Sequence, residues 1–150
     1  MNKIETPIAE TFSGWVHKLN INDVPKNVVD KLQLIVMDSF GLMVSAKNEQ
    51  YIKSLINALK ENGDCTLVGH NKKVNPVNAS IINGTAIHGE DFDDTFEGTP
   101  VHVGSVMVPA MLSSAQAKNL DGEKFLKGLV VGSELILSLI HISEPTRQSL

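Results

Sequence analysis

The sequence is poor in the residue types that mark several specialised protein classes. Its 150 residues include one cysteine, one tryptophan and one tyrosine. The single cysteine, Cys65, cannot form an internal disulfide and has no cysteine partners at the spacing of a metal site. We therefore expect a protein of a reducing compartment, the cytoplasm.

Excess positive charge and long apolar runs are also missing. The chain has 13 Lys and Arg against 17 Asp and Glu, a net charge of −4, which argues against a nucleic-acid partner. The longest apolar stretches are interrupted by Asp38 and Glu134 and fall short of the ~18 residues that span a bilayer. The polar N-terminus lacks the apolar stretch of a signal peptide. We predict neither a nucleic-acid nor a membrane partner.

Apolar residues recur at helical spacing through most of the chain and predict six helices. The first begins at Thr6 and Pro7, and the second at Asp23 and Pro25, since a capping residue before proline favours a helix start. The second helix becomes apolar on nearly all sides, which predicts a central core helix. Gly63 suits the left-handed position after the third helix.

The second half of the chain repeats these patterns. Asn75 and Pro76 begin a helix rich in small residues, which allow another backbone to approach closely. The next helix, near residues 105–118, must start, kink or tighten at Pro109. A last helix follows Gly122, and the only strand-like signal is near residues 65–75. The predicted fold class is all-α, with at most a short β-hairpin.

The densest polar cluster lies between residues 88 and 102. Like charges repel at this spacing, so such a cluster persists where it binds a cation, shares protons or is solvated. A solvated acidic helix end and a metal site completed by a histidine both remain open. The cluster comprises His88, Glu90, Asp91, Asp93, Asp94, Thr95 and His102.

A magnesium-dependent phosphotransferase is an alternative function. DFDDT satisfies the Asp-x-Asp-x-Thr pattern of haloacid-dehalogenase-type enzymes, in which Asp91 would attack phosphorus and Asp93 would act as acid and base. That pattern should follow a buried strand of branched aliphatic residues. The residues before Asp91 do not match such a strand. The conformation of residues 81–90 therefore tests the phosphotransferase interpretation, which requires a strand there rather than a helix.

Residues 83–112, NGTAIHGEDFDDTFEGTPVHVGSVMVPAML, resemble the signature region of the MmgE/PrpD family of 2-methylcitrate dehydratases and cis-aconitate decarboxylases. The segments at 32–46 and 132–134 also sit where that family would place them. The similarity therefore extends over most of the chain from residue 8 to residue 136. Val103 departs from the pattern, because members often have proline after the histidine.

The resemblance implies a lyase that acts on small polycarboxylates by dehydration, decarboxylation or related isomerisation. It implies no redox cofactor, no metal and a homodimer in the full-length form. Residues 1–136 would be part of the large helical domain, and the smaller C-terminal α+β domain would be absent. Such a chain is expected to be inactive as it stands, and a non-catalytic helical module is a further alternative.

Three residues match active-site positions of that family: Asp91, Thr95 and His102. A histidine titrates near pH ~6.5, so His102 is the candidate general acid or base. Thr95 can donate a hydrogen bond to a substrate carboxylate, and Asp91 can orient an imidazole or help to move a proton. His88 can form a hydrogen bond within the site, but a buried structural role for His88 is at least as well supported by the sequence. Because the motif supplies no cation for a polycarboxylate, the groups that bind substrate carboxylates are expected outside this sequence. The resemblance also implies a further catalytic histidine and lysine beyond residue 136.

The end of the chain has a separate interpretation. Residues 137–147, LSLIHISEPTR, resemble the in-frame translation of a transposon-end adapter used in sequencing libraries. We expect residues 137–150 to be a non-native tail, so that His141 takes no part in any site. A natural amphipathic C-terminus is the alternative.

Overall fold

The computed structural model of the chain describes residues 7–59, 61–97 and 100–143, with side chains as far as residue 138. Within these residues there are six α-helices and one two-stranded antiparallel sheet, as the sequence predicts. Short 3₁₀ turns occur at Ile21–Asp23 and Ala46–Asn48. The main elements are α1 (Ile8–Lys18), α2 (Lys26–Ser45), α3 (Gln50–Ala58), β1 (Asn62–Thr66), β2 (Lys73–Val74), α4 (Pro76–His88), α5 (Val103–Ala117) and α6 (Gly122–Ser143).

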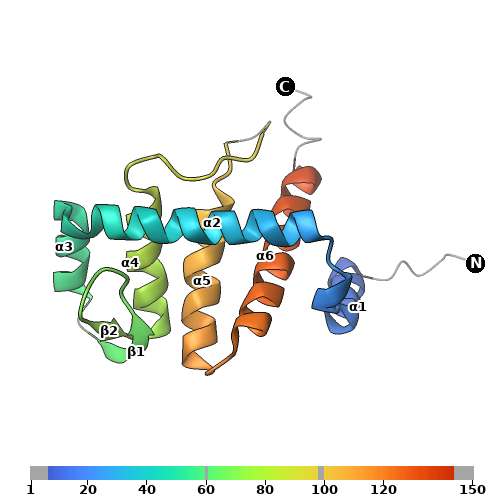
Figure 1. Cartoon of the computed structure of the whole chain (residues 1–150), viewed down its shortest axis with the longest axis horizontal. Helices are drawn as coiled ribbons and strands as arrows, with labels where there is room; N and C mark the ends of the chain where they lie inside the picture. Colours follow the sequence, from blue (N-terminus) through green and yellow to red (C-terminus); the bar gives the residue numbers. More distant parts are fainter. Residues whose placement is uncertain (1–6, 60, 98–99, 144–150) are drawn as a thin grey trace, which may run out of the picture.

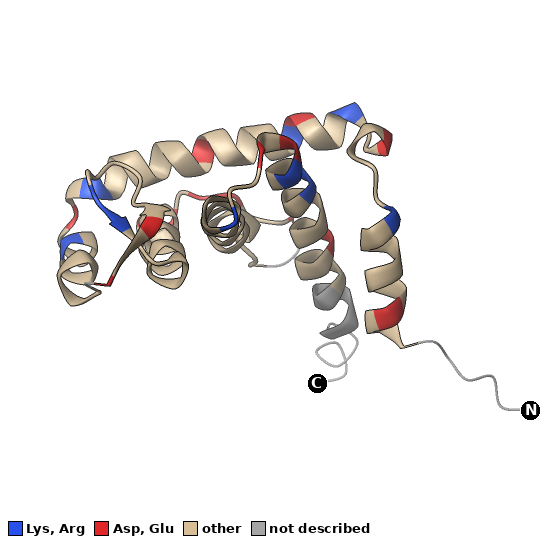
Figure 2. Ribbon diagram, turned by 90° about the horizontal axis from the view of Figure 1, so that it is seen from below, with Lys and Arg blue, Asp and Glu red and all other residues tan. Residues whose placement is uncertain are grey.

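One long helix crosses a row of three others. Figure 1 shows α4, α5 and α6 side by side in chain order, with α2 lying across all three. The helix α3 and the hairpin adjoin α4 at one end, while α1 lies at the other end, near α6 in both Figure 1 and Figure 2. The row of helices therefore brings the end of α4 and the start of α5 to the same edge, where the polar cluster lies.

The helix starts follow the predicted positions to within a few residues. The side-chain oxygen of Asn75 accepts a hydrogen bond of 2.8 Å from the backbone N–H of Asn78, the expected cap for α4. Pro7 and Pro25 directly precede α1 and α2, rather than occupying their first turn. The predicted cap Thr6 lies outside the described residues.

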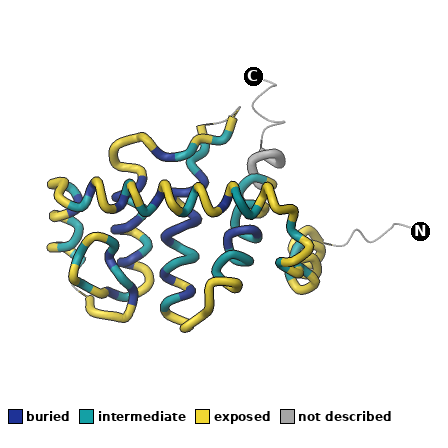
Figure 3. The backbone as a smooth tube through the Cα atoms, viewed as in Figure 1, coloured by how far each residue is buried: buried dark blue, intermediate teal, exposed yellow. Residues whose placement is uncertain are grey.

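The prediction that the second helix forms the centre of the core is wrong. Within the described chain α2 buries only Leu32, Ser39 and Met43, whereas Leu34 and Met37 are 54% and 67% exposed. Figure 3 shows the buried positions concentrated in α4 and α5 instead. Because α2 lies across α4, α5 and α6 on one face of that row, only one side of α2 contacts these helices.

Close approach of α4 to α5 depends on a glycine and a proline. Pro109 lies inside α5 and has no N–H, so the carbonyl of Ser105 loses its helical donor. A Cβ atom at Gly84 would lie 3.0 Å from that carbonyl oxygen, which is tighter than ordinary packing. The small residues of α4 therefore let the two backbones meet, as predicted, and α5 continues through Pro109 from Val103 to Ala117.

The predicted role of Gly63 as a helix terminator is wrong. The third helix ends at Ala58, and Gly63 lies in β1, where a Cβ would collide with the backbone of Val74. Because glycine has no Cβ, β1 can approach β2 closely at this position. Among the described glycines, the one with a left-handed backbone is Gly69, with φ of 82°, between the two strands.

The last helix runs beyond the end of the predicted native segment. Residues 137–143 continue α6, which begins at Gly122, and the non-native origin of the tail stays a prediction. Across the part of the chain that the structure describes, the helices are all too short or too polar to cross a membrane.

Candidate functional site

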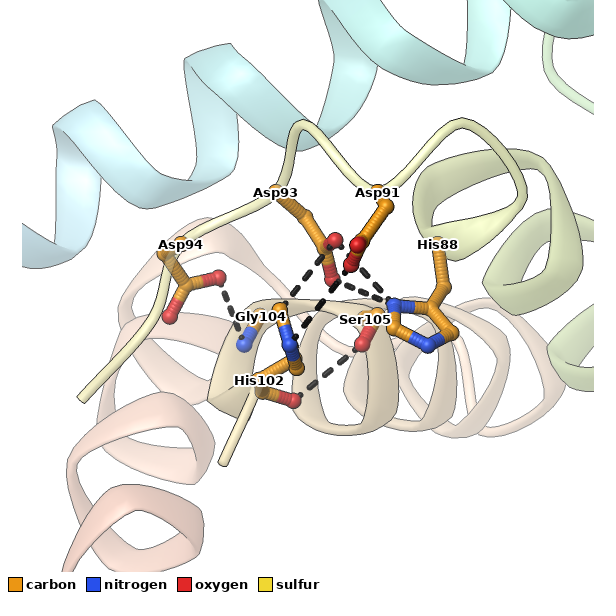
Figure 4. A network of polar contacts seen from close by, with 7 residues as sticks. All are labelled: His88, Asp91, Asp93, Asp94, His102, Gly104 and Ser105. Atoms are coloured by element: carbon orange, nitrogen blue, oxygen red, sulfur yellow. Dashed lines mark hydrogen bonds and ion pairs between the residues drawn. The ribbon is translucent and has the colours of Figure 1, made fainter. Parts of the chain in front are cut away.

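Two helix ends bring the two histidines of the motif together. His88 is the last residue of α4, and His102 directly precedes the first residue of α5. Their ring centroids are 4.7 Å apart. The loop that joins the helices carries the aspartates over the histidine pair, as Figure 4 shows.

The loop begins with a sharp turn at Asp91. This residue has φ of 57°, a left-handed conformation that few residues other than glycine, asparagine and aspartate adopt readily. Its N–H donates a 3.0 Å hydrogen bond to the carbonyl of His88. The turn therefore sends the chain back across the end of α4 towards α5.

A tyrosine from α3 holds the same turn from outside. The Tyr51 hydroxyl donates a 2.9 Å hydrogen bond to Glu90. Burial and this bond to the carboxylate raise the pKa of Tyr51 to about 12. A Cβ at Gly89 would collide with the Tyr51 ring, so glycine at 89 allows this contact.

The fully buried carboxylate of Asp93 lies between the two imidazoles. Its oxygens are 3.1 and 3.2 Å from Nδ1 of His88, and Oδ1 is 3.3 Å from Nδ1 of His102. Neither side-chain oxygen of Asp93 faces solvent, since the exposed fraction of the side chain is 0%. Sequence reasoning did not include Asp93 among the lyase site residues, although its place between two histidines in the motif was visible.

Asp91 approaches the opposite nitrogen of His102. Its Oδ1 lies 3.8 Å from Nε2 of that ring, and its side chain is 81% exposed. One ligand atom from each of His88, Asp91, Asp93 and His102 lies within 4.8 Å of the others. This arrangement can exchange protons between carboxylates and imidazoles, and its donor types also suit a divalent cation.

The neighbouring Asp94 bonds to the backbone of α5 rather than to a histidine ring. Its Oδ1 accepts a 2.9 Å hydrogen bond from the backbone N–H of Gly104, in the first turn of α5. Burial raises the pKa of the Asp94 carboxyl, while the bond from Gly104 opposes the rise. Adjacent aspartates of the motif thus serve two purposes, since Asp93 contacts the histidines and Asp94 secures the start of α5.

The structure brings Asp91, His88 and His102 together, but places Thr95 elsewhere. Thr95 is exposed and lines a separate cavity of about 440 Å³ between α2, α5 and α6. Lys31 of α2 lines the same cavity. Sequence reasoning missed this cation because it lies 64 residues from Thr95 along the chain, and only the crossing of α2 over the row brings the two into one cavity.

The phosphotransferase interpretation is wrong. The residues that precede Asp91 form α4, a helix, rather than the buried strand which that chemistry requires. Asp91 itself lies in a turn with a left-handed backbone. The Asp-x-Asp-x-Thr match is therefore a coincidence of spacing.

Comparison with known proteins gives consistent matches. The chain matches the MmgE/PrpD N-terminal domain over residues 10–149. It is 30% identical over 141 residues to the cis-aconitate decarboxylase-like protein oryM of Aspergillus oryzae, covering 87% of this chain and 29% of that protein. Cis-aconitate decarboxylase of Aspergillus terreus is 25% identical over 136 residues, which are 85% of this chain and 28% of the relative. The mouse enzyme of the same name is 26% identical over 147 residues, 93% of this chain and 30% of the relative. The chain thus spans less than a third of the length of these relatives.

Proposed function

Because the chain belongs to the MmgE/PrpD family, we propose that it forms the helical N-terminal part of a lyase acting on small polycarboxylates. The single observation that carries the proposal is the histidine-aspartate cluster at the α4–α5 loop. Dehydration and decarboxylation of such substrates both move protons to or from carbon, which needs an acid or base at a defined place. The relatives named as cis-aconitate decarboxylases support this substrate class.

His102 is the general acid or base of the proposed site. Its Nε2 faces Asp91 on the exposed side of the cluster, where a substrate can approach. A cavity of about 310 Å³ lies beside His88 and the first turns of α5. In this proposal His88 and Asp91 contact the bound substrate, and Asp91 also helps to move the proton.

Thr95 is proposed to donate a hydrogen bond to a substrate carboxylate from the neighbouring cavity. Lys31, on the same cavity, offers a positive charge that a polycarboxylate requires. The carboxylates of Asp94 and Glu134 line that cavity as well, so one lysine does not neutralise it. Further cations are proposed to come from the part of the protein that corresponds to the remainder of the longer relatives.

The domain arrangement follows the same proposal. Residues 1–136 form part of the helical domain, residues 137–150 are a non-native tail, and an α+β domain completes the whole enzyme. We propose that these 150 residues are inactive alone, that the whole enzyme is a cytoplasmic homodimer, and that it needs no metal or redox cofactor. The lone buried Cys65 suits a reducing compartment.

The test uses a full-length protein in which residues 1–136 are joined to the complete C-terminal part of a relative. Methylcitrate, citrate and cis-aconitate are assayed with a chelator present. We expect turnover of at least one substrate, and a loss of about 10²-fold or more in His102→Ala, the usual scale of general acid-base catalysis. His17→Ala is the control, because His17 lies on α1 outside the cluster.

Three results would each contradict a part of the proposal. Near-normal turnover by His102→Ala would remove the proposed role of the loop. Absence of turnover with all three substrates, in a correctly folded joined protein, would favour the non-catalytic helical module. Activity that disappears with the chelator would instead assign a metal to the four clustered donors.

A further inference from the structure

Asp93 is the one carboxylate of the cluster that contacts both imidazoles. We propose that Asp93 is a positioning residue that holds His102 in the tautomer with hydrogen on Nδ1, leaving Nε2 as the proton-accepting atom. This inference rests on the proposed function, because it explains how His102 can act as a base. It concerns a residue that contacts the histidine rather than the substrate.

The direction of the hydrogen bonds follows from the chemistry of a carboxylate. An ionised aspartate accepts hydrogen bonds and donates none. Both oxygens of Asp93 lie near Nδ1 of His88, and Oδ1 also lies near Nδ1 of His102. A lone pair on either Nδ1 would face the anion directly, so the attractive arrangement has hydrogen on both nitrogens.

Burial makes this preference strong. Asp93 has no exposed side-chain surface, so water does not replace a missing donor. Nδ1 of His102 is itself buried and lacks an aligned hydrogen-bond partner among the described residues. This nitrogen lies 3.3 Å from Oδ1 of Asp93. A rotation of the ring that points its N–H at Oδ1 would satisfy both groups with one hydrogen bond.

The opposite nitrogen is thereby left free on the exposed side. A neutral imidazole carries one hydrogen and one lone pair on its two ring nitrogens. With hydrogen on Nδ1, the lone pair of His102 is on Nε2, beside the exposed Asp91. When Nε2 takes a proton from the substrate, the resulting imidazolium lies between Asp93 and Asp91. Asp93 takes no proton in this step, and Nε2 later returns the proton to the product or to water.

His88 has a supporting part in this arrangement. Its Nδ1 is within hydrogen-bond distance of both oxygens of Asp93, which fixes the plane of the carboxylate. Figure 4 shows the carboxylate of Asp93 bridging the two rings from the loop above them. The orientation of His102 therefore depends on a carboxylate that another histidine already holds.

The test is the ring-nitrogen NMR spectrum of the chain labelled with ¹⁵N, because the nitrogen that bears hydrogen resonates well upfield of the other. Spectra are recorded with a chelator at about pH 9, above the ordinary titration of imidazole near ~6.5. His102 is assigned from the signal that His102→Gln removes. We expect the Nδ1–H form to predominate at His102, the reverse of the preference of a free histidine side chain.

Asp93→Asn supplies the matched comparison. A neutral amide is a weaker acceptor than a carboxylate, so the ratio of Nδ1–H to Nε2–H at His102 should fall by about tenfold. Asp94→Asn is the control, since Asp94 bonds to Gly104 rather than to a histidine. Asp94→Asn makes the same exchange of carboxylate for amide in the same loop, and it should leave the ratio of Nδ1–H to Nε2–H at His102 unchanged.

Predominance of Nε2–H at His102 in the native chain would overturn the inference, and so would an unchanged ratio in folded Asp93→Asn. If Asp93→Asn does not fold, the native spectrum decides alone. The proposed function fails separately, through normal turnover by His102→Ala. If the protein shows the expected tautomer but no lyase activity, Asp93 still positions His102, and only the reaction proposed for His102 is wrong.

Discussion

Asp94 and Gly104 form a contact that glycine alone permits. The carboxylate of Asp94 accepts a 2.9 Å hydrogen bond from the Gly104 N–H, and a Cβ at position 104 would overlap the same carboxylate oxygen. That Cβ would also lie 3.0 Å from Cγ2 of Ile35 on α2. The contact therefore ties the loop of the candidate site to the first turn of α5, directly after His102.

Gly104→Ala should destabilise the protein. The added methyl group displaces Asp94 from the N–H that it satisfies, and loss of such a helix cap costs about 0.5–2 kcal/mol. The free energy of unfolding, measured by urea denaturation, should fall by about that amount. Gly41→Ala is the control, because Gly41 lies in α2 with nothing within 4 Å of its added Cβ. It should stabilise by up to about 1 kcal/mol, since alanine favours helix over glycine. Equal effects of the two substitutions would contradict the packing described for Gly104.

Asp94 should make stability depend on pH in the acidic range. Its pKa is raised in the folded state, chiefly by burial, so the folded protein holds this proton at a pH where the unfolded chain has lost it. The stabilisation is complete below the ordinary carboxyl pKa of ~3.9 and is lost as pH rises through the raised value. The difference in unfolding free energy between wild type and Asp94→Asn should therefore move in favour of the variant as pH rises across this window. A difference that is constant with pH would contradict the raised pKa.

Tyr51 offers a direct titration, because it is the only tyrosine in the chain. Absorbance of the tyrosinate ion should give a midpoint near the pKa of about 12. Glu90→Gln should lower this pKa towards the ordinary value of ~10, since it removes the charge that faces the hydroxyl. The folded protein should also lose stability as pH rises from ~10 through the raised value, because the unfolded chain ionises first.

Glu49→Gln is the control for the tyrosine titration. Glu49 is the weakest of the influences that raise the pKa of Tyr51, so this substitution should lower the midpoint less than Glu90→Gln does. A midpoint near ~10 in the native protein would show that Tyr51 is not bound to Glu90.

The exposed apolar side of α2 should cause self-association. Met37 is 67% exposed and lines an apolar cavity of about 480 Å³ between α2 and α6, with Phe40 and Phe125. Contiguous apolar surface of this kind is adhesive. Light scattering should show dimers or larger species that decrease in Met37→Lys. Lys53→Met, which adds an apolar side chain to the exposed position 53 of α3, should not decrease them. A well-behaved monomer in the native chain would contradict this prediction.

The helices could be predicted from the sequence because their signals are local. Asn75 caps α4 through its own side chain, and the spacing of apolar residues identifies each helix without knowledge of its neighbours. The burial of α2 could not be predicted in this way. Leu34 and Met37 read as core residues from their hydrophobicity, but the helices that α2 meets lie on its other side.

Part of the candidate site was equally accessible from the sequence. His88, Asp91 and His102 lie within a stretch of 15 residues, and the resemblance to a family indicated two of them as active-site positions. The different directions of Asp93 and Asp94 were not accessible, because they depend on where α5 begins relative to α4. The same holds for Lys31, which reaches the cavity of Thr95 from α2.

By itself, the sequence determined the helical elements, the hairpin turn and the group of residues able to exchange protons, since each depends on neighbours along the chain. Only the tertiary structure decided which carboxylate is buried between the histidines and which secures α5. Burial and hydrogen-bond geometry arise when α4 and α5 pack through Gly84 and Pro109. Two adjacent aspartates with the same chemistry thereby acquire different partners. The packed helices set the course of the loop, so that Asp93 meets the two histidines and Asp94 meets the N–H of Gly104.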